Sequence, residues 1–281
     1  MAESELTIPA FSAHICLYAN SDATEVDAAL TSAFKVQTYC PAELVVVFDG
    51  PVSEAVEEVI DSFAKILPCR IIRLLDNMGH GYARAAAIAN TRYAWSAVID
   101  ADDISQPDRF EHLCKIAKTQ PELAVIGSAL TEFYEADGEF RAVRERFYPE
   151  TTDEIIDFAR SRSPIAQPTA LLNVSAIRAV GNYKSWHNNE DYYLWLRLLK
   201  AGYKMYNVQK SLLLFRTNLA LYGRRGGLVY WWNEVRLQWF SLRQSTTTPS
   251  RFFFGIAVRF VIQVMMPPRV RRLIYCKLLG N

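Results

Sequence analysis

The sequence predicts an α/β fold: a Rossmann-like mixed β-sheet with helices on both faces. Between residues 13 and 119, short apolar runs alternate with segments of helical periodicity, the pattern of βαβ units that build a parallel sheet. The run 43–48 is almost continuously apolar, as in a strand covered on both faces, and we expect it at the centre of the sheet. Turn residues at 136–138 separate two further strand-like segments, which predicts an antiparallel pair.

The predicted elements follow the chain in order. Strands are expected at 14–18, 43–48, 69–75 and 95–100, with helices at 24–37, 53–66, 79–91 and 107–119. The antiparallel pair is expected at 123–134 and 139–147. A helix begins near Asn189 and ends at Gly202, because apolar side chains recur there at helical spacing. Two last helices are predicted at 227–244 and 251–266, before a Pro-Pro stop.

Charge divides the chain of 281 residues into two parts. Residues 1–220 hold 21 basic and 29 acidic side chains, whereas residues 221–281 hold 10 basic side chains and a single acidic one, Glu234. We therefore expect a main domain over 1–220 and basic, aromatic-rich helices over 221–281. A basic segment of this kind is typical of a nucleic-acid or membrane partner. No groove-reading motif or stacking platform supports nucleic acid.

The basic region is expected to lie on a membrane surface without crossing it. Its longest apolar stretch, 252–266, contains Arg259 and Gln263 and is shorter than the roughly 20 residues that a spanning helix needs. Basic and bulky apolar side chains alternate over 251–281, as in interfacial helices, although packing on the main domain is an alternative. Five scattered cysteines and an N-terminus without a basic, apolar leader favour a cytoplasmic protein.

Three carboxylates, Asp100, Asp102 and Asp103, directly follow the fourth predicted strand. Ligands of open parallel sheets bind beyond the carboxyl ends of the strands, and grouped carboxylates there suit Mg²⁺ or Mn²⁺ bound to substrate phosphates. Asp49 follows the strand 43–48 and is expected in the same crevice. An acidic turn without a ligand is the structural alternative at each place. Two acids at the ends of separate strands favour a shared nucleotide-and-metal crevice.

The segment 77–81, Asn-Met-Gly-His-Gly, follows the third predicted strand and opens a helix. Its glycines allow the backbone to approach a ligand. Neither GxGxxG nor GxxxxGK[ST] occurs, so the sequence does not support a dinucleotide site or a P-loop. His80 is expected near the site, and Arg84, one helical turn further on, either meets a phosphate or is solvated.

Glu190 and Asp191 begin the predicted helix at 189–202. Acids at a helix start are stabilised by the helix dipole, which is one explanation for them. In the functional interpretation, one carboxylate is a general base that takes a proton from a substrate hydroxyl, and the other orients it. In the basic region, Arg224 and Arg225 stand beside two glycines. Paired guanidinium groups suit a phosphate or diphosphate, and a basic loop without a ligand is the alternative.

Taken together, these motifs resemble those of family 2 glycosyltransferases with a GT-A fold. The resemblance is to the bacterial type that builds polysaccharide repeat units, a group that includes the amylovoran biosynthesis transferases. It covers nearly the whole chain, and the segments that carry it are 17–20, 47–51, 77–81, 100–110, 190–197 and 224–227. The chain departs from many relatives at Gln167, where they often have histidine before Pro-Thr, and in the Ala-Val-Ile that precedes Asp100.

The resemblance implies a role for each matching residue. Contacts to a nucleotide-diphospho-sugar donor, expected to be a UDP-sugar, would come from Tyr18, Asn20, Asp49, Asn77, His80, Arg84, Asp100, Ala101 and Asp102. Asp100 and Asp102 would form the DxD motif that holds Mn²⁺ or Mg²⁺, with Asp102 the direct ligand. Asp191 would be the catalytic base beside Glu190. Arg224 and Arg225 would contact the acceptor or its diphosphate.

The activity implied by the resemblance is an inverting, metal-dependent sugar transfer in cell-surface polysaccharide biosynthesis, such as capsule or exopolysaccharide. The acceptor would be a saccharide linked to a lipid diphosphate at the inner face of the cytoplasmic membrane. A sugar-phosphate nucleotidyltransferase is one alternative, but residues 14–24 lack the glycine-rich loop with Arg and Lys that such enzymes show. A non-catalytic nucleotide-sugar or membrane-binding module is the other, and the intact Asp102 and Asp191 argue against it.

Overall fold

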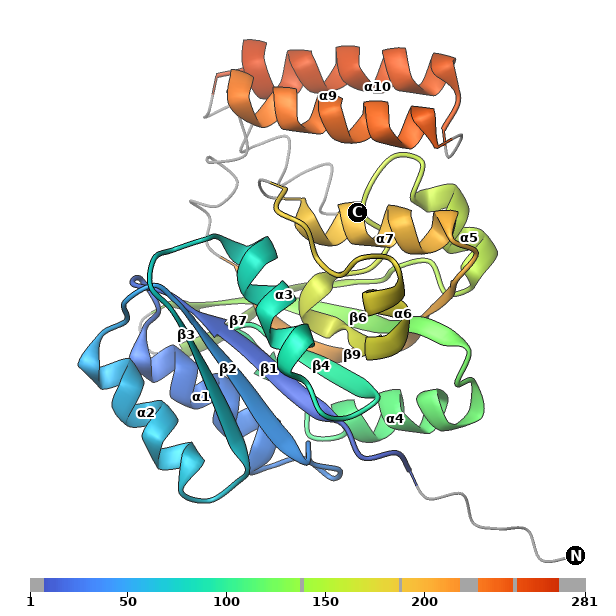
Figure 1. Cartoon of the computed structure of the whole chain (residues 1–281). Helices are drawn as coiled ribbons and strands as arrows, with labels where there is room; N and C mark the ends of the chain where they lie inside the picture. The colour runs from blue at the N-terminus through green and yellow to red at the C-terminus, as the bar shows by residue number, and fades with distance from the viewer. Residues whose placement is uncertain (1–7, 137–138, 187–188, 218–226, 245–246, 268–281) are drawn as a thin grey trace, which may run out of the picture.

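A nine-stranded mixed β-sheet runs through the described part of the chain, with its strands in the order β3-β2-β1-β4-β8-β6-β9-β5 and β7 paired with β6 (Figure 1). The computed structural model describes residues 8–136, 139–186, 189–217, 227–244 and 247–267. Helices cover both faces of the sheet, as the sequence predicts (Figure 1). A pair of C-terminal helices lies beyond one of these helical layers (Figure 1).

The four predicted βαβ strands are confirmed and form the parallel half of the sheet. They are β1 Ser12–Leu17, β2 Glu43–Asp49, β3 Cys69–Leu74 and β4 Trp95–Ile99. Because they are parallel, their carboxyl ends meet at one edge, where Asp49 ends β2 and where Tyr18 and Asp100 follow β1 and β4. All seven residues of β2 are buried, as its apolar run predicts. The central place expected for β2 is wrong, because the sheet extends beyond β4 and leaves β2 next to the edge strand β3.

The other half of the sheet is mostly antiparallel. Its strands are β5 Ile104–Ser105, β6 Leu123–Ala136, β7 Glu139–Arg146, β8 Leu171–Asn173 and β9 Lys204–Arg216. The predicted hairpin is confirmed by the antiparallel pairing of β6 with β7, and its turn residues 137–138 lie outside the described ranges. β8 joins the two halves, since it pairs antiparallel with β4 on one side and with β6 on the other.

Two helical layers bury the apolar faces of the sheet (Figure 1). On one face lie α1 Ala23–Phe34, α2 Glu54–Ala64 and α4 Arg109–Thr119, which bury Leu30, Phe63 and Phe110 in the main core. On the other lie α3 His80–Asn90, α6 Val174–Ala179 and α7 Glu190–Lys200, which bury Ile88, Ile177 and Trp195. Two short elements, α5 Thr152–Phe158 and the 3₁₀ helix η1 Gln167–Thr169, connect β7 to β8. The predicted helix at 189–202 is confirmed as α7.

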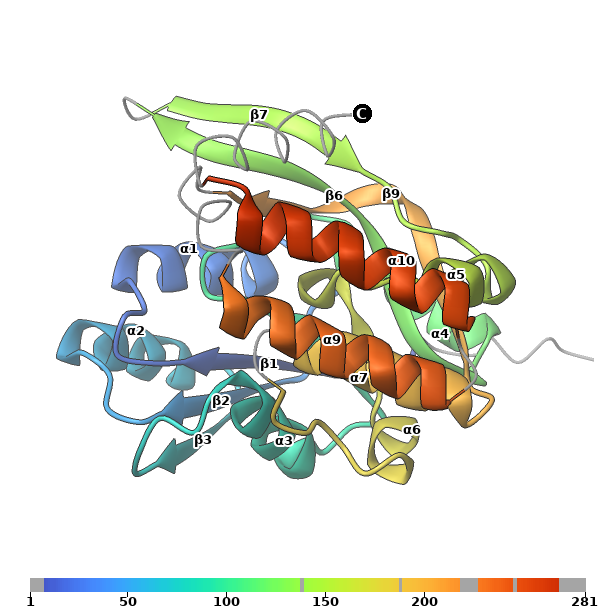
Figure 2. The same cartoon turned by 90° about the horizontal axis from the view of Figure 1, so that it is seen from above.

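The C-terminal helices form an antiparallel pair over α7 (Figures 1 and 2). They are α9 Leu228–Arg243 and α10 Pro249–Phe260, and a π-helical turn, η2 Val261–Met265, continues α10. Both helices match the segments predicted at 227–244 and 251–266. The domain boundary expected near residue 220 lies in 218–226, outside the described residues. Among the helices that the structure describes, none combines the length and the apolar character needed to cross a bilayer.

Strand β9 is the largest element that the sequence did not reveal. Its residues 209–211 are exposed or half-buried, and the pairing with β6 shifts register beside them, between Ser128 and Ala129. The irregular pairing breaks the alternation of apolar and polar residues by which a strand is recognised. The short elements β5, β8, α5 and α6 also lack a periodic signal.

Candidate active site

A small cavity of about 180 Å³ lies beyond the carboxyl ends of β1, β2 and β3. The residues predicted to hold a donor that line it are Tyr18, Asp49, Asn77 and His80. The rings of Tyr18 and His80 meet edge to face at 6.1 Å, whereas Asn20 is exposed in the loop after β1. The structure thus brings together residues from three separate segments of the chain, after β1, at the end of β2 and after β3.

Asp49 closes this cavity by holding the next loop. Its carboxylate accepts hydrogen bonds from the backbone N–H groups of Met78, at 2.6 Å, and Gly79, at 2.9 Å. Gly50, the next residue, has φ +83°, and a Cβ there would lie 2.9 Å from the backbone nitrogen of Asn77. Glycine is required at this position because the two loops approach so closely. The sequence Asp49-Gly50 therefore fixes the start of α3 against the end of β2.

The three carboxylates after β4 have different surroundings. Asp103 is buried, and one of its oxygens accepts a hydrogen bond from the backbone N–H of Arg216 at 2.9 Å. The Arg216 guanidinium donates to the carbonyl of Asp102 at 3.0 Å, so the end of β9 holds the turn in place. Asp102 is exposed, and partial desolvation followed by the charge of Asp100 raises its pKa to about 6. Asp103 is thus a structural residue, and Asp100 and Asp102 remain for a ligand.

Asp100 and Asp102 fit a divalent cation that also binds substrate phosphates. Within the described ranges, no group of three or more His, Cys, Asp or Glu side chains is arranged to hold a metal by itself. Mg²⁺ at nucleotide sites is bound by one or two carboxylates, and water and phosphate oxygens complete the shell. The raised pKa of Asp102 also reflects concentrated negative charge, which a bound cation would offset. The donor set therefore suits a metal that arrives with a nucleotide diphosphate.

Arg84 connects the carboxylate turn to the Glu-Asp pair at the start of α7. Its Nη1 donates to Glu190 Oε1 at 2.5 Å, and its Nη2 donates to Asp100 Oδ1 at 3.3 Å. Burial opposes the charge of Arg84, but Asp100 and Glu190 raise its pKa above the ordinary value. The sequence suggested either a phosphate contact or a solvated side chain. Arg84 is not solvated, because it is buried and engaged by two carboxylates.

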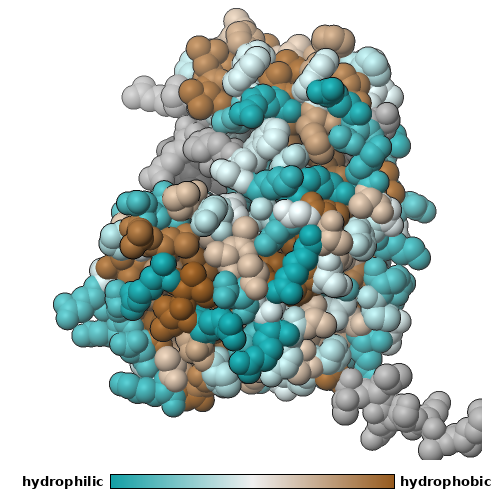
Figure 3. Space-filling model, in the orientation of Figure 1, coloured by the Kyte–Doolittle hydropathy of each residue, from teal (hydrophilic) through white to brown (hydrophobic). Residues whose placement is uncertain are grey.

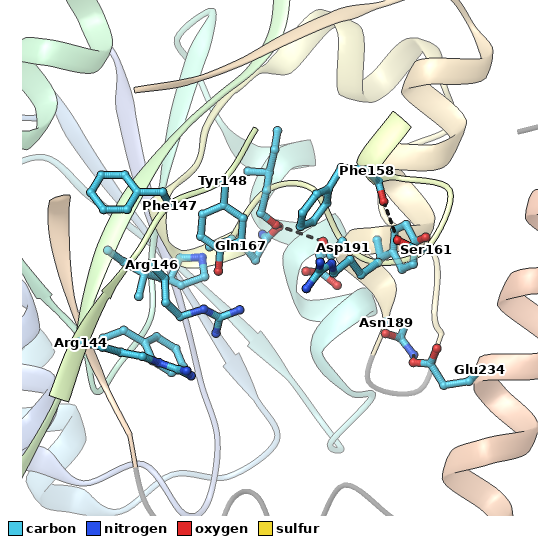
Figure 4. Close-up of a pocket in the computed structure, with 18 of the residues that line it drawn as sticks. Arg144, Arg146, Phe147, Tyr148, Phe158, Ser161, Gln167, Asn189, Asp191 and Glu234 are labelled. Atoms are coloured by element: carbon cyan, nitrogen blue, oxygen red, sulfur yellow. Dashed lines mark hydrogen bonds between the residues drawn. The ribbon is translucent and has the colours of Figure 1, made fainter. Parts of the chain in front are cut away.

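Asp191, the neighbour of Glu190, is half-buried on the wall of a larger pocket of about 780 Å³ (Figure 4). Burial, followed by the negative charge of Glu190, raises the pKa of Asp191 to about 7, while Arg84 works in the opposite direction. A general base is most effective when its pKa lies near the operating pH. Asp191 therefore has both the access and the proton affinity that a general base needs.

Several elements supply the walls of this pocket. The β7 strand contributes Arg144 and Arg146, and Phe158 ends α5 (Figure 4). Gln167, the residue that departs from many relatives, lines the pocket and donates through its amide to the Tyr183 hydroxyl at 2.6 Å. α9 and α10 close another side with Glu234 and Arg259. Arg224 and Arg225, predicted to meet the acceptor, lie outside the described residues.

The C-terminal helices are anchored to α7 on one side. Leu237 is fully buried there, and Phe240 meets Tyr193 edge to face at 4.8 Å. Glu234 accepts a hydrogen bond from the Asn189 amide at 2.9 Å and pairs with Arg259 at 3.4 Å. Much of the remaining surface of the pair is apolar and exposed, as Figure 3 shows at the end of the molecule formed by α9 and α10. The exposed apolar side chains are Leu228, Val229, Trp232, Trp239, Phe253, Phe254, Val258, Val261 and Met265.

The sequence did not reveal three contributions to this site. Arg216 holds the carboxylate turn, and Arg144 and Arg146 line the pocket across from Asp191 (Figure 4). Arg216 lies in the unpredicted strand β9, and the exposed residues of β7 gave no motif. Only the charge of these side chains was visible in the sequence, and charge alone does not distinguish a solvated face from a binding wall.

Comparisons with known proteins match this chain to glycosyltransferases. The family model described as glycosyl transferase family 2 matches residues 12–181. The chain is 31% identical to the amylovoran biosynthesis glycosyltransferase AmsE of Erwinia amylovora over 270 residues, which are 95% of this chain and 98% of that protein. It is 27% identical to the UDP-Gal:α-D-GlcNAc-diphosphoundecaprenol β-1,3-galactosyltransferase of Escherichia coli over 271 residues, 96% of this chain and 97% of that one.

A solved structure has a similar fold. The mannosyltransferase PcManGT from Pyrobaculum calidifontis, in complex with GDP-mannose and Mn²⁺, aligns with a TM-score of 0.60 at 14% identity. The alignment covers 98% of this chain and 77% of that chain.

Proposed function

The chain belongs to glycosyl transferase family 2, and we propose that it transfers a sugar, with inversion, from a nucleotide-diphospho-sugar to a lipid-diphosphate-linked saccharide. The family and the GT-A-like fold predicted from the motifs are confirmed, and the chain is a glycosyltransferase. A nucleotidyltransferase or a non-catalytic module therefore finds no support. The name of the Erwinia relative refers to amylovoran biosynthesis, and that of the E. coli relative to a GlcNAc-diphosphoundecaprenol acceptor. These names support a lipid-diphosphate-linked acceptor for this chain.

The observation that carries the proposal is the link from Asp100 through Arg84 to Glu190, next to Asp191. In a single displacement, the acceptor hydroxyl attacks the anomeric carbon while a base removes its proton. Asp191 lies on the wall of the large pocket, and Asp49 lines the separate small cavity. This arrangement supports Asp191 as the base and the small cavity as the place of the nucleoside.

The donor side is proposed to need a divalent cation. Asp100 and Asp102 would hold Mn²⁺ or Mg²⁺ with the donor diphosphate, and the cation would supply charge neutralisation for the leaving nucleoside diphosphate. Tyr18, Asn20, Asn77, His80 and Ala101 are proposed to contact the donor beside Asp49. Arg84 keeps Asp100 and Glu190 in fixed positions, so its proposed effect on the donor acts through Asp100. The named donor of the E. coli relative, UDP-Gal, supports a UDP-sugar here.

The exposed apolar side chains of α9 and α10 support a peripheral membrane location. Four arginines and one glutamate lie in the described residues of this pair, and Glu234 is neutralised by Arg259. A basic surface with exposed Trp and Phe side chains is typical of helices that lie in an anionic membrane interface. We therefore place the enzyme, as part of the proposal, at the inner face of a bacterial cytoplasmic membrane. The side of α9 that packs on α7 would face the domain and not the membrane.

The proposal is tested with purified protein, Mn²⁺, and UDP-, GDP- or dTDP-sugars. The acceptor is an undecyl diphosphate-linked N-acetylglucosamine, and mass spectrometry detects the product. Expected are a product one sugar larger with one of these donors and, by NMR, an anomeric configuration opposite to that of the donor. Retained configuration would overturn the single displacement. Release of free sugar alone, with no product on this acceptor, would overturn the proposed acceptor class.

A further inference from the structure

The pocket that contains Asp191 has a second feature, two arginines stacked on aromatic rings. Arg146, in β7, lies with its Cζ 5.6 Å from the centre of the Tyr148 ring. Arg162, after α5, lies with its Cζ 4.5 Å from the centre of the Phe158 ring. All four residues line the same pocket. A guanidinium that lies over a ring keeps the N–H groups at its edge directed outward, where they can bind an anion in bidentate fashion.

Arg146 is held in place by a buried carboxylate. Glu132, in β6, is only 1% exposed and accepts from Arg144 Nε at 2.8 Å and Nη2 at 3.1 Å. Arg146 contacts the same carboxylate through Nη1 at 3.0 Å. The two guanidinium groups share this one buried carboxylate. Arg144 orients the carboxylate, and Arg146, with about a third of its side chain exposed, has further donors for a ligand.

The other pocket arginines differ in their partners. Arg259 pairs with Glu234 at 3.4 Å and donates to the carbonyl of Ser161. Within the described ranges, Arg162 forms no ion pair, and its charge lies only against the Phe158 ring. Arg146 and Arg162 therefore both keep N–H donors for an anionic ligand.

From these contacts we infer that Arg146 and Arg162 bind the diphosphate of the acceptor, with its sugar between them and Asp191. The inference rests on the proposed function and names a subsite within it. A diphosphate carries two adjacent anionic groups, each able to take a bidentate guanidinium. The donor diphosphate is assigned to Asp100 and Asp102, and none of the residues that line the donor cavity lines this pocket. The volume of about 780 Å³ falls in the range of about 300–1,000 Å³ typical of small-molecule sites.

The surroundings of the pocket fit a lipid substituent on this diphosphate. Tyr230 and Arg259, from α9 and α10, form part of the wall. The outer surface of the same two helices carries exposed Phe253 and Phe254. Arg146 of β7 lines the same pocket as Tyr230 and Arg259, so the arginine wall and the two helices belong to one site. A lipid substituent on the bound diphosphate would leave the pocket beside these two helices.

Binding is measured first, without any transfer reaction. Geranyl diphosphate is titrated into the full-length protein by calorimetry in the presence of EDTA, which removes metal from the donor side. Arg146→Gln and Arg162→Gln are each expected to weaken binding about 10- to 100-fold, the range for lost hydrogen bonds to a charged group. Arg141→Gln is the matched control, because Arg141 is in β7 but does not line the pocket, and it should change binding less than about twofold.

Three results of this titration would overturn the subsite. Unchanged affinity in both pocket variants would show that the diphosphate binds elsewhere. An equal loss in Arg141→Gln would indicate a general charge effect. If UDP displaced geranyl diphosphate in EDTA, and both pocket variants bound UDP as weakly as they bind geranyl diphosphate, the pocket would be assigned to the nucleotide. Thermal unfolding checks folding, and Arg146→Lys, which keeps the charge, is expected to restore part of the affinity.

Kinetics then separates this inference from the proposed function. With the undecyl diphosphate acceptor, both pocket variants should raise KM about 10- to 100-fold and leave kcat nearly unchanged. With octyl N-acetylglucosaminide, which has no phosphate, their KM should equal that of the parent. If the parent binds geranyl diphosphate through these arginines but transfers sugar to neither acceptor, the proposed function fails and the subsite stands. If the parent transfers sugar and the variants match it on both acceptors, the subsite fails alone.

Discussion

Arg84 Nη1 lies 2.5 Å from Glu190 Oε1, which joins the second turn of α3 to the first residue of α7 across 106 positions of sequence. The same guanidinium reaches Asp100 at 3.3 Å. One buried cation thus fixes the carboxylate that we assign to the metal and the residue next to the proposed base. The donor and acceptor sides of the site are held at a constant separation by this contact.

Replacing Arg84 by Gln is expected to lower kcat about 100-fold, because the donor and the base would lose their relative position. It should also lower the free energy of unfolding by about 3–5 kcal/mol, since two carboxylates lose their buried partner. Steady-state kinetics and denaturant unfolding measure the two effects. Arg73→Gln is the control, because its pair with Glu57 is exposed, and its unfolding free energy should change by less than about 1 kcal/mol. Parental kcat in Arg84→Gln would contradict the positioning role.

Asp191→Asn should lower kcat by about 10² to 10⁴, the usual contribution of a general base, with donor binding unchanged. Single-turnover transfer and donor calorimetry separate the two quantities. Asp27→Asn, on the exposed surface of α1, serves as the control for loss of a carboxylate. A variant that transfers sugar at the parental rate would place the base at another residue.

The pH dependence of kcat/KM should report Asp191. Burial and then the charge of Glu190 raise its pKa to about 7, and only the unprotonated form accepts a proton. Activity is therefore expected to fall as pH drops below about 7. Glu190→Gln removes one negative neighbour, so the pKa of Asp191 should fall and the acid limb should move to lower pH. Rate profiles of both proteins from about pH 5 to pH 9 test this, and a limb that stays in place or moves upward would refute it.

Asp102→Asn should abolish the gain in donor affinity that Mn²⁺ provides, because a carboxamide is a weaker ligand for a hard cation than a carboxylate. Calorimetry of UDP-sugar binding with Mn²⁺ and with EDTA gives the comparison. In the parent, EDTA should reduce binding as strongly as the substitution does. Asp61→Asn, in α2, should leave the Mn²⁺ effect intact. Equal Mn²⁺ dependence in Asp102→Asn and the parent would exclude this residue as a metal ligand.

The double variant Phe253→Ser, Phe254→Ser should reduce partitioning onto anionic liposomes at least tenfold. Both side chains are mostly exposed, and burial of one large apolar side chain contributes about 1.5–3 kcal/mol, whereas a factor of ten needs about 1.4. Liposome co-sedimentation measures the effect. Val36→Ser, Ile66→Ser removes two exposed apolar side chains away from α9 and α10 and should partition like the parent. Equal losses in both double variants would argue against a membrane-facing role for the helical pair.

The strength of the local signal decided which elements could be predicted. β2 was predictable because its continuous apolar run is typical of a buried strand. α7 was predictable because its regular apolar stripe is typical of a helix with one buried face. β9 was not predictable, because its irregular pairing with β6 interrupts the alternation of apolar and polar residues. The role of Arg144 and Arg146 was not predictable either, because it depends on their contacts with Glu132 and on their place in the pocket wall. The side chains near the donor cavity were predictable because each lies at the end of a parallel strand or in the loop after it, and all such ends meet at one edge.

The sequence by itself determined the family, the parallel half of the sheet and the identity of the residues at its carboxyl edge, because these depend on local patterns and ordered motifs. Only the tertiary structure decided that Arg84 is buried between Asp100 and Glu190, that Asp103 supports the turn, and that Asp191 lies in a pocket with Arg146. The physical reason is that charge pairing and desolvation depend on distances between residues far apart in the chain. No local pattern encodes these distances until the sheet and its helices have packed.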